Sequence, residues 1–224
     1  MPRDTKPRWA HITVRGIEPE SEAMKISLGP NSYFWSRERT LEFYREAREW
    51  PVNIVHLGET ICSKRRELRT PDWLALAQPL INAGKEVVLS SLALIEAESE
   101  LGALRRAIEE GGLLVEANDL SAVQLCRKAG RGFVAGPTLN IYNPRTLAML
   151  RDDGMVRWVP GVEQGQAQVR ELLDACAADG YTPPELEIIV WGRPALAYSA
   201  RCFTARALDV AKDESGSLDR RTGI

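Results

Sequence analysis

Four cysteines are the residues of this chain best suited to metal or redox chemistry, and they fall into two kinds. Cys62 and Cys202 lie in predicted loops beside basic residues, which favour the thiolate form that ligates metals and clusters. Cys126 and Cys176 lie in amphipathic stretches, SAVQLCRK and ELLDACAA, where a cysteine is usually a small buried apolar residue. No CxxC pair is present, so spacing alone leaves Cys62 and Cys202 open to ligation or to an ordinary reduced state.

Other polar residues collect after the predicted strands, at the edge where parallel strands place their functional groups. These are Gly29, Pro30, Asn31, Gly58, Glu59, Ser63, Lys64, Arg65, Arg66, Glu116, Asn118, Asp119, Gly136, Pro137, Asn140, Glu163, Tyr198, Ser199, Arg201 and Arg206. The run from Lys64 to Arg66 fits either an anion site or a solvated surface. His56 falls inside a predicted strand, which favours a buried supporting role. Hydrolase, kinase and dinucleotide-binding motifs (HExxH, GxSxG, Walker, GxGxxG) do not occur.

The elements that position these residues alternate between short β-branched runs and amphipathic stretches. Seven strands are predicted, at residues 25–28, 52–57, 86–90, 113–116, 132–135, 155–159 and 187–191. Asn143 followed by Pro144 indicates a helix start, and glycines at 84, 111, 130, 154 and 180 indicate helix ends. Several of the strands are continuous apolar runs, as is typical of parallel strands covered on both faces.

The pattern predicts an α/β fold, a TIM-barrel-like (β/α) series of about seven units that is incomplete at its C-terminus. Seven units in series fall one short of the usual eight, and 224 residues fall short of the roughly 250 that such a barrel needs. A smaller open sheet is the alternative. We expect residues 1–23, which precede Met24, to be a disordered extension, residues 24–214 to form the barrel domain, and residues 215–224 to be a divergent tail.

Composition narrows the class of protein further. A net charge of −2 gives no field that would attract nucleic acid. No apolar run approaches the roughly 20 residues that cross a bilayer, and the N-terminal residues lack the apolar stretch of a secretion signal. We therefore expect a cytoplasmic protein with no transmembrane segment.

Several separated stretches together resemble the UbiV family, ubiquinone-biosynthesis proteins of the collagenase-like peptidase superfamily. They are ISLGPNSYFW, HLGETICSKRREL, VVLSSLALI, LLVEANDL, FVAGPTLNIYN and LAYSARCFTARALDVAKDE, and the resemblance runs from Met24 to about Glu214. It implies a 4Fe-4S protein that works as a heterodimer with a UbiU-like partner. The activity implied is the anaerobic, oxygen-independent hydroxylation of a ubiquinone precursor ring.

The resemblance also implies site residues. Cys62 in GETICSKRR and Cys202 in ARCFTAR match two of the family's four cluster ligands. Ser215 and Asp219 stand where the third and fourth would be, and the sequence departs from the family after KDE. The resemblance thus implies that the chain is C-terminally truncated relative to the family. Because an iron-sulfur cluster is normally held by four thiolates, we expect this chain alone to hold no stable cluster and to lack the family's activity.

Two other functions remain open from sequence. One is a collagenase-like peptidase, which the superfamily's name raises and the missing hydrolase motifs disfavour. The other is a non-catalytic scaffold that stabilises a UbiU-like partner. Nothing in the sequence assigns catalytic residues, the oxygen donor or the electron source.

Overall fold

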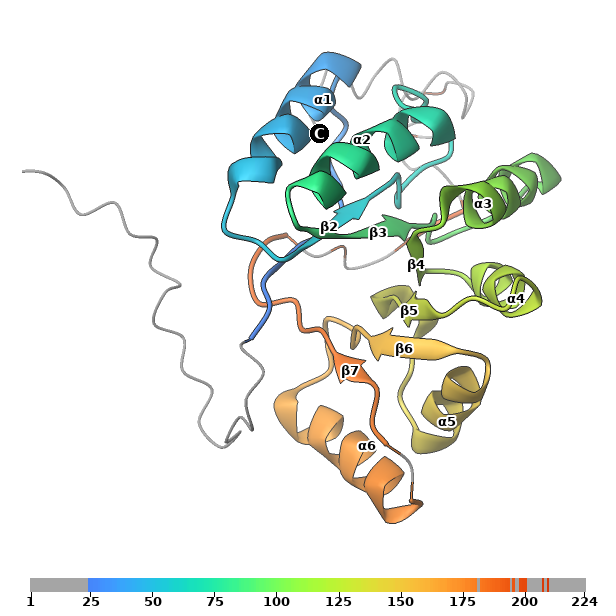
Figure 1. The fold of residues 1–224 in the computed structure, drawn as a ribbon. Helices are drawn as coiled ribbons and strands as arrows, with labels where there is room; N and C mark the ends of the chain where they lie inside the picture. The colour runs from blue at the N-terminus through green and yellow to red at the C-terminus, as the bar shows by residue number, and fades with distance from the viewer. Residues whose placement is uncertain are drawn as a thin grey trace, which may run out of the picture.

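The computed structural model describes residues 24–180, 182–193, 195, 198–200, 207 and 209. Within them, seven parallel strands form one sheet in the order in which they occur along the chain (Figure 1). The strands are β1 (Ser27–Leu28), β2 (Ile54–Leu57), β3 (Glu86–Ser90), β4 (Leu114–Ala117), β5 (Phe133–Ala135), β6 (Met155–Trp158) and β7 (Glu185–Leu186). Parallel neighbours in strict chain order require a crossover after every strand, and the helices supply it.

The helices cover the outer face of the curled sheet (Figure 1). They are α1 (Arg37–Glu46), α2 (Thr70–Asn82), α3 (Glu98–Gly111), α4 (Leu120–Lys128), α5 (Pro144–Asp152) and α6 (Gln166–Ala178). Two short 3-10 helices, η2 (Ala47–Glu49) and η3 (Pro137–Leu139), complete the order. The structure is thus a curled half-barrel of seven parallel strands, which confirms the predicted incomplete TIM-barrel-like series.

The first six strands overlap their predicted ranges, and the seventh is misplaced in the prediction. Residues 187–191 were expected to form it, whereas β7 is Glu185–Leu186. The backbone nitrogen of Glu187 still donates to the oxygen of Trp158 at 3.0 Å. On β6 the next residues are Val159 and Pro160, and proline has no N–H to continue the ladder. The strand therefore pairs earlier than its most apolar residues indicate.

Cap residues set most of the helix boundaries as predicted, with one exception. Asn143 accepts a hydrogen bond from the backbone nitrogen of Thr146 at 2.9 Å, which starts α5. Gly111 was expected to end a helix, but it is the last residue inside α3, and the neighbouring Gly112 takes the left-handed conformation with φ 64°. A Cβ at Gly111 would lie 2.9 Å from Cδ2 of Leu74, so this glycine lets α2 and α3 approach closely.

The main hydrophobic core lies between the helices and the outer face of the sheet. Phe133 and Trp158 on the strands pack in one cluster with Leu147 and Leu150 of α5, all nearly inaccessible to water. Burying each such side chain contributes roughly 1.5–3 kcal/mol. Cys126 and Cys176 belong to the same cluster, which confirms their predicted place in the core.

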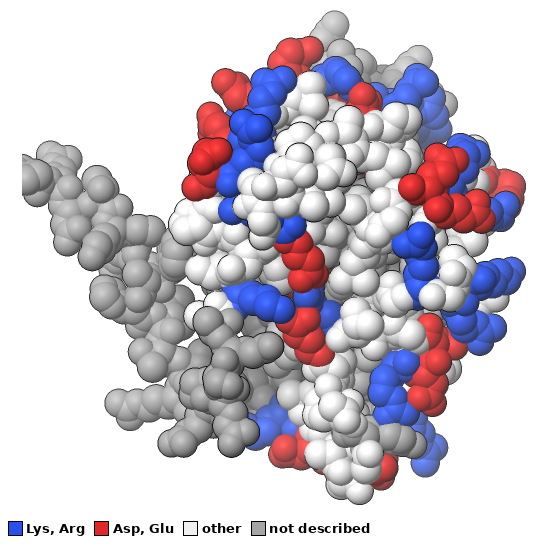
Figure 2. Space-filling view, in the orientation of Figure 1, with Lys and Arg blue, Asp and Glu red and all other residues white. Residues whose placement is uncertain are grey.

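A second, smaller set of side chains fills the inside of the curl. Ile54, Val88, Val134 and Val159 form an apolar cluster there. Successive residues of a strand point to opposite faces, so His56, Glu116 and Arg157 share this interior with them. In the view of Figure 2, acidic and basic side chains lie side by side across the middle of an otherwise largely uncharged face.

Some predicted features stay predictions. Residues 1–23 and 215–224 lie outside the described part of the chain, so the proposed extension and tail are untested. Among the described residues, no helix combines the length and the apolarity that a membrane crossing requires.

Candidate functional site at the carboxyl edge of the sheet

The loop after β2 carries Cys62 and is a compact turn. Glu59 accepts hydrogen bonds at Oε1 from the backbone nitrogens of Ile61 at 2.8 Å and of Cys62 at 3.1 Å. The oxygen of Cys62 then accepts from the backbone nitrogen of Arg65 at 3.0 Å. Cys62 is a free thiol of intermediate exposure. It is therefore a fixed, partly accessible thiol at the edge where the sequence placed it.

A glycine makes this turn possible. Gly58 has φ 131°, and a Cβ there would lie 2.4 Å from the backbone oxygen of Ser90 on the neighbouring strand. Any other residue would meet both the unfavourable backbone conformation and this contact. The position of the Cys62 loop thus depends on Gly58.

Arg65 joins this loop to the one after β1. Its Nη1 donates to the oxygen of Ser32 at 2.9 Å and lies 3.8 Å from Oε1 of Glu59, while its guanidinium carbon lies 5.6 Å from the ring centroid of Phe34. Of the three basic residues in the predicted run, Arg66 is exposed and Lys64 is intermediate. Arg65 therefore has a structural role, and an anion could meet Arg66 and Lys64 only at the surface.

A small cavity lies between these two loops, lined by side chains that include Tyr33, Trp35, Glu59 and Arg65. Its volume is about 30 Å³. That is the space of about one water molecule.

The loops after β3, β4 and β5 are locked together by Asn118. Its backbone nitrogen donates to Oγ of Ser91 at 3.0 Å, and its Nδ2 donates to the backbone oxygen of Ser91 at 3.1 Å. Its own oxygen accepts from Oγ1 of Thr138 at 2.6 Å. A Cβ at Gly136 would lie 2.0 Å from Oδ1 of Asn118. Asp119 caps α4 by accepting from the nitrogen of Ser121 at 2.8 Å, so both predicted site residues have structural roles.

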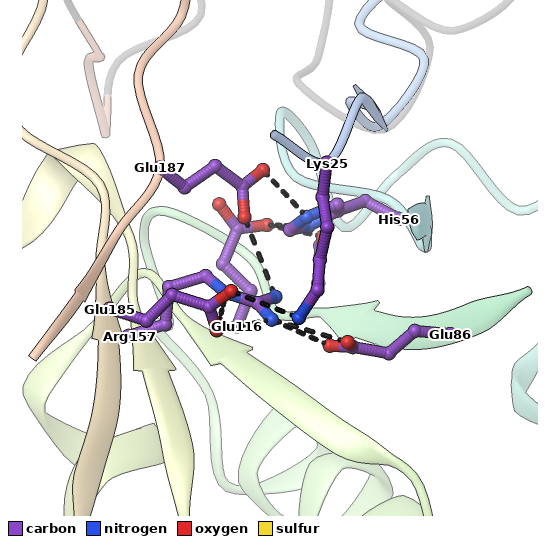
Figure 3. A network of polar contacts seen from close by, with 8 residues as sticks. Lys25, His56, Glu86, Glu116, Arg157, Glu185 and Glu187 are labelled. Atoms are coloured by element: carbon purple, nitrogen blue, oxygen red, sulfur yellow. Dashed lines mark hydrogen bonds and ion pairs between the residues drawn. The ribbon is translucent and has the colours of Figure 1, made fainter. Parts of the chain in front are cut away.

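Inside the curl, His56 lies between two carboxylates (Figure 3). Its Nδ1 is 3.2 Å from Oε2 of Glu116, and its Nε2 is 3.0 Å from Oε1 of Glu187. The hydroxyl of Ser90 also donates to Oε2 of Glu116. Burial lowers the pKa of His56, but the charges and hydrogen bonds of Glu116 and Glu187 outweigh it and raise the pKa to about 10. The ring is therefore an imidazolium that is hydrogen-bonded to Glu116 through Nδ1 and ion-paired with Glu187 at Nε2.

The two carboxylates respond in the opposite direction. Burial raises the pKa of Glu116, yet His56 and hydrogen bonds from Ser90 and Asn118 bring it below its ordinary value. Burial likewise raises the pKa of Glu187, and His56 and Arg157 bring it below the ordinary value. Both groups are carboxylates at neutral pH. The sequence placed Glu116 at the carboxyl edge, and the structure turns its side chain into the curl.

A second charged layer lies nearer the amino ends of the strands (Figure 3). Arg157 on β6, only 3% exposed, donates from Nη2 to Oε1 of Glu86 on β3 at 2.9 Å and from Nε to Oε2 of Glu185 on β7 at 2.9 Å. Lys25 Nζ lies 3.3 Å from Oε1 of Glu185. Sequence reasoning missed this layer. Its one available signal was an arginine at an inward position of the otherwise apolar strand MVRW.

The remaining predicted residues divide between described and undescribed parts of the chain. Burial and the charge of Glu116 raise the pKa of Tyr198, which is half-buried. Asn140 has a left-handed backbone with φ 54° after η3, and the hydroxyl of Tyr142 donates a hydrogen bond to Oε1 of Glu163. Cys202, Arg201, Arg206, Ser215 and Asp219 lie outside the described residues, so their relation to Cys62 stays a prediction.

Comparison with known proteins identifies the class to which this fold belongs. A family model described as peptidase family U32 matches residues 39–218. The chain therefore belongs to peptidase family U32, in agreement with the collagenase-like superfamily that the sequence resembles.

Solved structures show more distant similarity. A mandelate racemase/muconate lactonizing protein from Paracoccus denitrificans Pd1222 is 15% identical, with a TM-score of 0.48 over 73% of this chain and 46% of that one. A phospho-2-dehydro-3-deoxyheptonate aldolase from Thermotoga maritima is 14% identical, with a TM-score of 0.36 over 73% of this chain and 60% of that one. The chain thus spans roughly half the length of the solved structures that it matches.

Proposed function

We propose that this chain is a UbiV-like subunit of an oxygen-independent system that hydroxylates a ubiquinone precursor, working with a UbiU-like partner. The observation that carries the proposal is the placement of Cys62. Of the three described cysteines, Cys126 and Cys176 are packed in the helix–sheet core, whereas Cys62 is a partly exposed thiol at the carboxyl edge. Membership of peptidase family U32 supports the superfamily within which the UbiV resemblance falls.

The proposed cofactor is a 4Fe-4S cluster with Cys62 and Cys202 as two of its ligands. Among the described residues, no group of three or more histidine, cysteine, aspartate and glutamate side chains is arranged to hold a metal ion. They contribute one thiolate, that of Cys62, and so do not complete a four-thiolate site. The cluster therefore rests on the resemblance, and no reaction step is assigned to it.

The peptidase alternative meets an obstacle in the interior polar cluster. Ser90, His56 and Glu116 are the residue types of a hydrolytic triad, but the hydroxyl of Ser90 donates to Glu116. Both nitrogens of His56 face carboxylate oxygens, so neither is directed at the serine to take its proton. All three side chains are also buried. The arrangement supports a structural cluster rather than a nucleophile.

The test is genetic. Deleting the intact gene in its host should abolish ubiquinone under anaerobic growth and leave aerobic ubiquinone unchanged. Complementation with an intact gene that encodes the family's cysteine-bearing C-terminal region should restore it, and the same gene with Cys62→Ser should not, with Cys126→Ser as the matched control for loss of a thiol from the core. Normal anaerobic ubiquinone in the deletion strain would refute the function. Full rescue by Cys62→Ser would favour a non-catalytic scaffold, and cleavage of gelatin by the purified protein would favour the peptidase.

A further inference from the structure

The curled sheet has an open side between its first and last strands. In the described sheet, β1 pairs with β2 and β7 pairs with β6, and no backbone ladder joins β7 to β1. Side chains cross this side instead. Near the amino ends, Lys25 contacts Glu185 at 3.3 Å, and further along His56 contacts Glu187 at 3.0 Å. The described strands therefore meet there through charge rather than through backbone hydrogen bonds.

The two crossings differ in their surroundings. The side chains of Lys25 and Glu185 are 45% and 44% exposed, so water and salt screen that pair and it contributes little. The side chains of His56 and Glu187 are 2% and 17% exposed, so their attraction is much less screened. Breaking the buried contact by removing one partner leaves the other as a poorly compensated charge.

His56 also cannot shift without cost, because its other nitrogen is held. Nδ1 faces Glu116 on β4 at 3.2 Å, and Glu116 in turn accepts from Ser90 on β3. The imidazolium thus connects β2, β3 and β4 on one side to the segment after β7 on the other (Figure 3). Because Nδ1 is hydrogen-bonded to Glu116 and Nε2 is ion-paired with Glu187, rotating the ring would separate it from at least one of the two carboxylates.

The elements tied together in this way border the mouth of the curl. His56 stands two residues before Gly58 and six before Cys62, and Glu187 begins the extended segment that follows β7. We propose that His56 is a positioning residue, which links β2 to the segment after β7 across the open side of the half-barrel and thereby fixes the distance between the Cys62 loop and that segment. This inference rests on the proposed function only because Cys62 is a proposed cluster ligand, and it can be tested on the metal-free protein.

The test measures that distance directly in the metal-free full-length chain. In a Cys202→Ser, Val190→Cys background, nitroxide labels react at positions 62 and 190, because Val190 is 74% exposed while Cys126 and Cys176 are 0% and 4% exposed. Pulsed electron–electron double resonance then gives the distribution of distances between the two nitroxide labels. We compare the parent with His56→Gln and Glu187→Ala, and use Lys25→Ala as the matched control on the screened crossing.

We expect a narrow distribution in the parent and in Lys25→Ala, and a distribution broadened about twofold or more in His56→Gln and Glu187→Ala. Circular dichroism reports whether each variant is folded. If His56→Gln does not fold, the result for Glu187→Ala tests the proposal, because the side chain of Glu187 reaches the surface and its removal disturbs the core less. Unchanged narrow distributions in the folded variants would overturn the proposal. A broadened distribution together with normal anaerobic ubiquinone in the gene deletion would uphold the positioning role and refute the proposed function.

Discussion

At the scale of single residues, the imidazole of His56 combines deep burial with two carboxylate partners. Burial favours the neutral ring, and Glu116 and Glu187 favour the charged one. The charged groups that face this cluster come from several elements, with Glu116 on β4, Glu187 after β7, and Arg157 on β6 opposite Glu187. Because the two carboxylates raise the pKa of His56 by more than burial lowers it, His56 couples the stability of the fold to pH.

The sign of that coupling follows from the direction of the shift. The pKa of His56 rises from its ordinary value of 6.5 to about 10 in the fold. The contribution of charged His56 to the free energy of unfolding is therefore fully present below pH 6.5 and is lost as the pH rises through 10. We expect the free energy of unfolding to fall between these values, on the order of a few kcal/mol.

Urea unfolding at pH 6 and pH 10 measures this change. Other groups titrate in the same range, so the relevant quantity is the difference between the wild type and His56→Gln, in which the fall should be smaller. Parallel pH profiles in the two proteins would show that His56 does not carry the effect.

Gly58 provides a second prediction at this scale. Gly58→Ala combines a φ of 131° with a Cβ 2.4 Å from the oxygen of Ser90, so we expect a loss of about 2 kcal/mol or more in the free energy of unfolding. Gly29→Ala is the matched control, because a Cβ at Gly29 meets nothing within 4 Å. Equal stabilities of the two variants by urea unfolding would contradict the role assigned to Gly58.

Sequence alone located Cys62 at the carboxyl edge and assigned Cys126 and Cys176 to the core, because each conclusion depends on local pattern. It did not find the partners of His56. Glu187 and Glu116 are 131 and 60 residues away along the chain. Their approach depends on the curl of the whole sheet, which no local spacing encodes.

At the scale of elements, the first six strands were predicted well because each is a short apolar run between clear boundaries. The seventh was displaced because its most apolar residues, from Ile188 to Trp191, are not the ones that pair. These residues are 46–88% exposed, with Trp191 the most exposed. Exposed apolar side chains beside an edge strand favour association.

We therefore expect the purified chain to self-associate as its concentration rises. Trp191→Lys should weaken that association about fivefold or more, because a Trp side chain that becomes buried between two copies contributes more than about 1 kcal/mol to the free energy of association. Sedimentation velocity over a concentration series measures it. Met149→Lys is the matched control, since Met149 is a 54% exposed apolar residue on α5, away from the edge. A wild-type chain that remains monomeric throughout the series would contradict this expectation.

At the scale of the whole molecule, seven parallel units in chain order were foreseeable from the alternation of strands and helices. The contacts across the open side of the curl were not, because they depend on charged side chains from the segment before β1, from β2 and β6, and from β7 and the segment after it, which meet only in the assembled fold. In the sequence, Glu86 and Glu185 each look like an ordinary surface residue, and only the inward position of Arg157 on an apolar strand indicates a buried charge. Their pairing with Arg157 becomes evident only in the folded sheet, where β3, β6 and β7 surround the same interior.

The last prediction concerns iron, and it follows from counting thiolates over the full sequence. Cys62 and Cys202 offer two, while Cys126 and Cys176 are committed to the core, where burial raises the pKa of Cys126 to about 11 and disfavours its thiolate. Ser215 and Asp219 offer oxygen, which suits iron-sulfur clusters poorly. Anaerobic reconstitution of the 224-residue chain should therefore give far fewer than four irons per chain and weak visible absorbance.

The matched variant is Ser215→Cys combined with Asp219→Cys, which supplies thiolates at the two positions where the UbiV resemblance places ligands. Iron content and charge-transfer absorbance should both rise in this variant, because four thiolates are then available to one cluster. Adding Cys62→Ala should lower both again, whereas adding Cys126→Ala should not. Near-stoichiometric loading of the unmodified chain would show that other ligands complete the site. If the double variant gains no iron, the assignment of positions 215 and 219 as ligand positions is wrong.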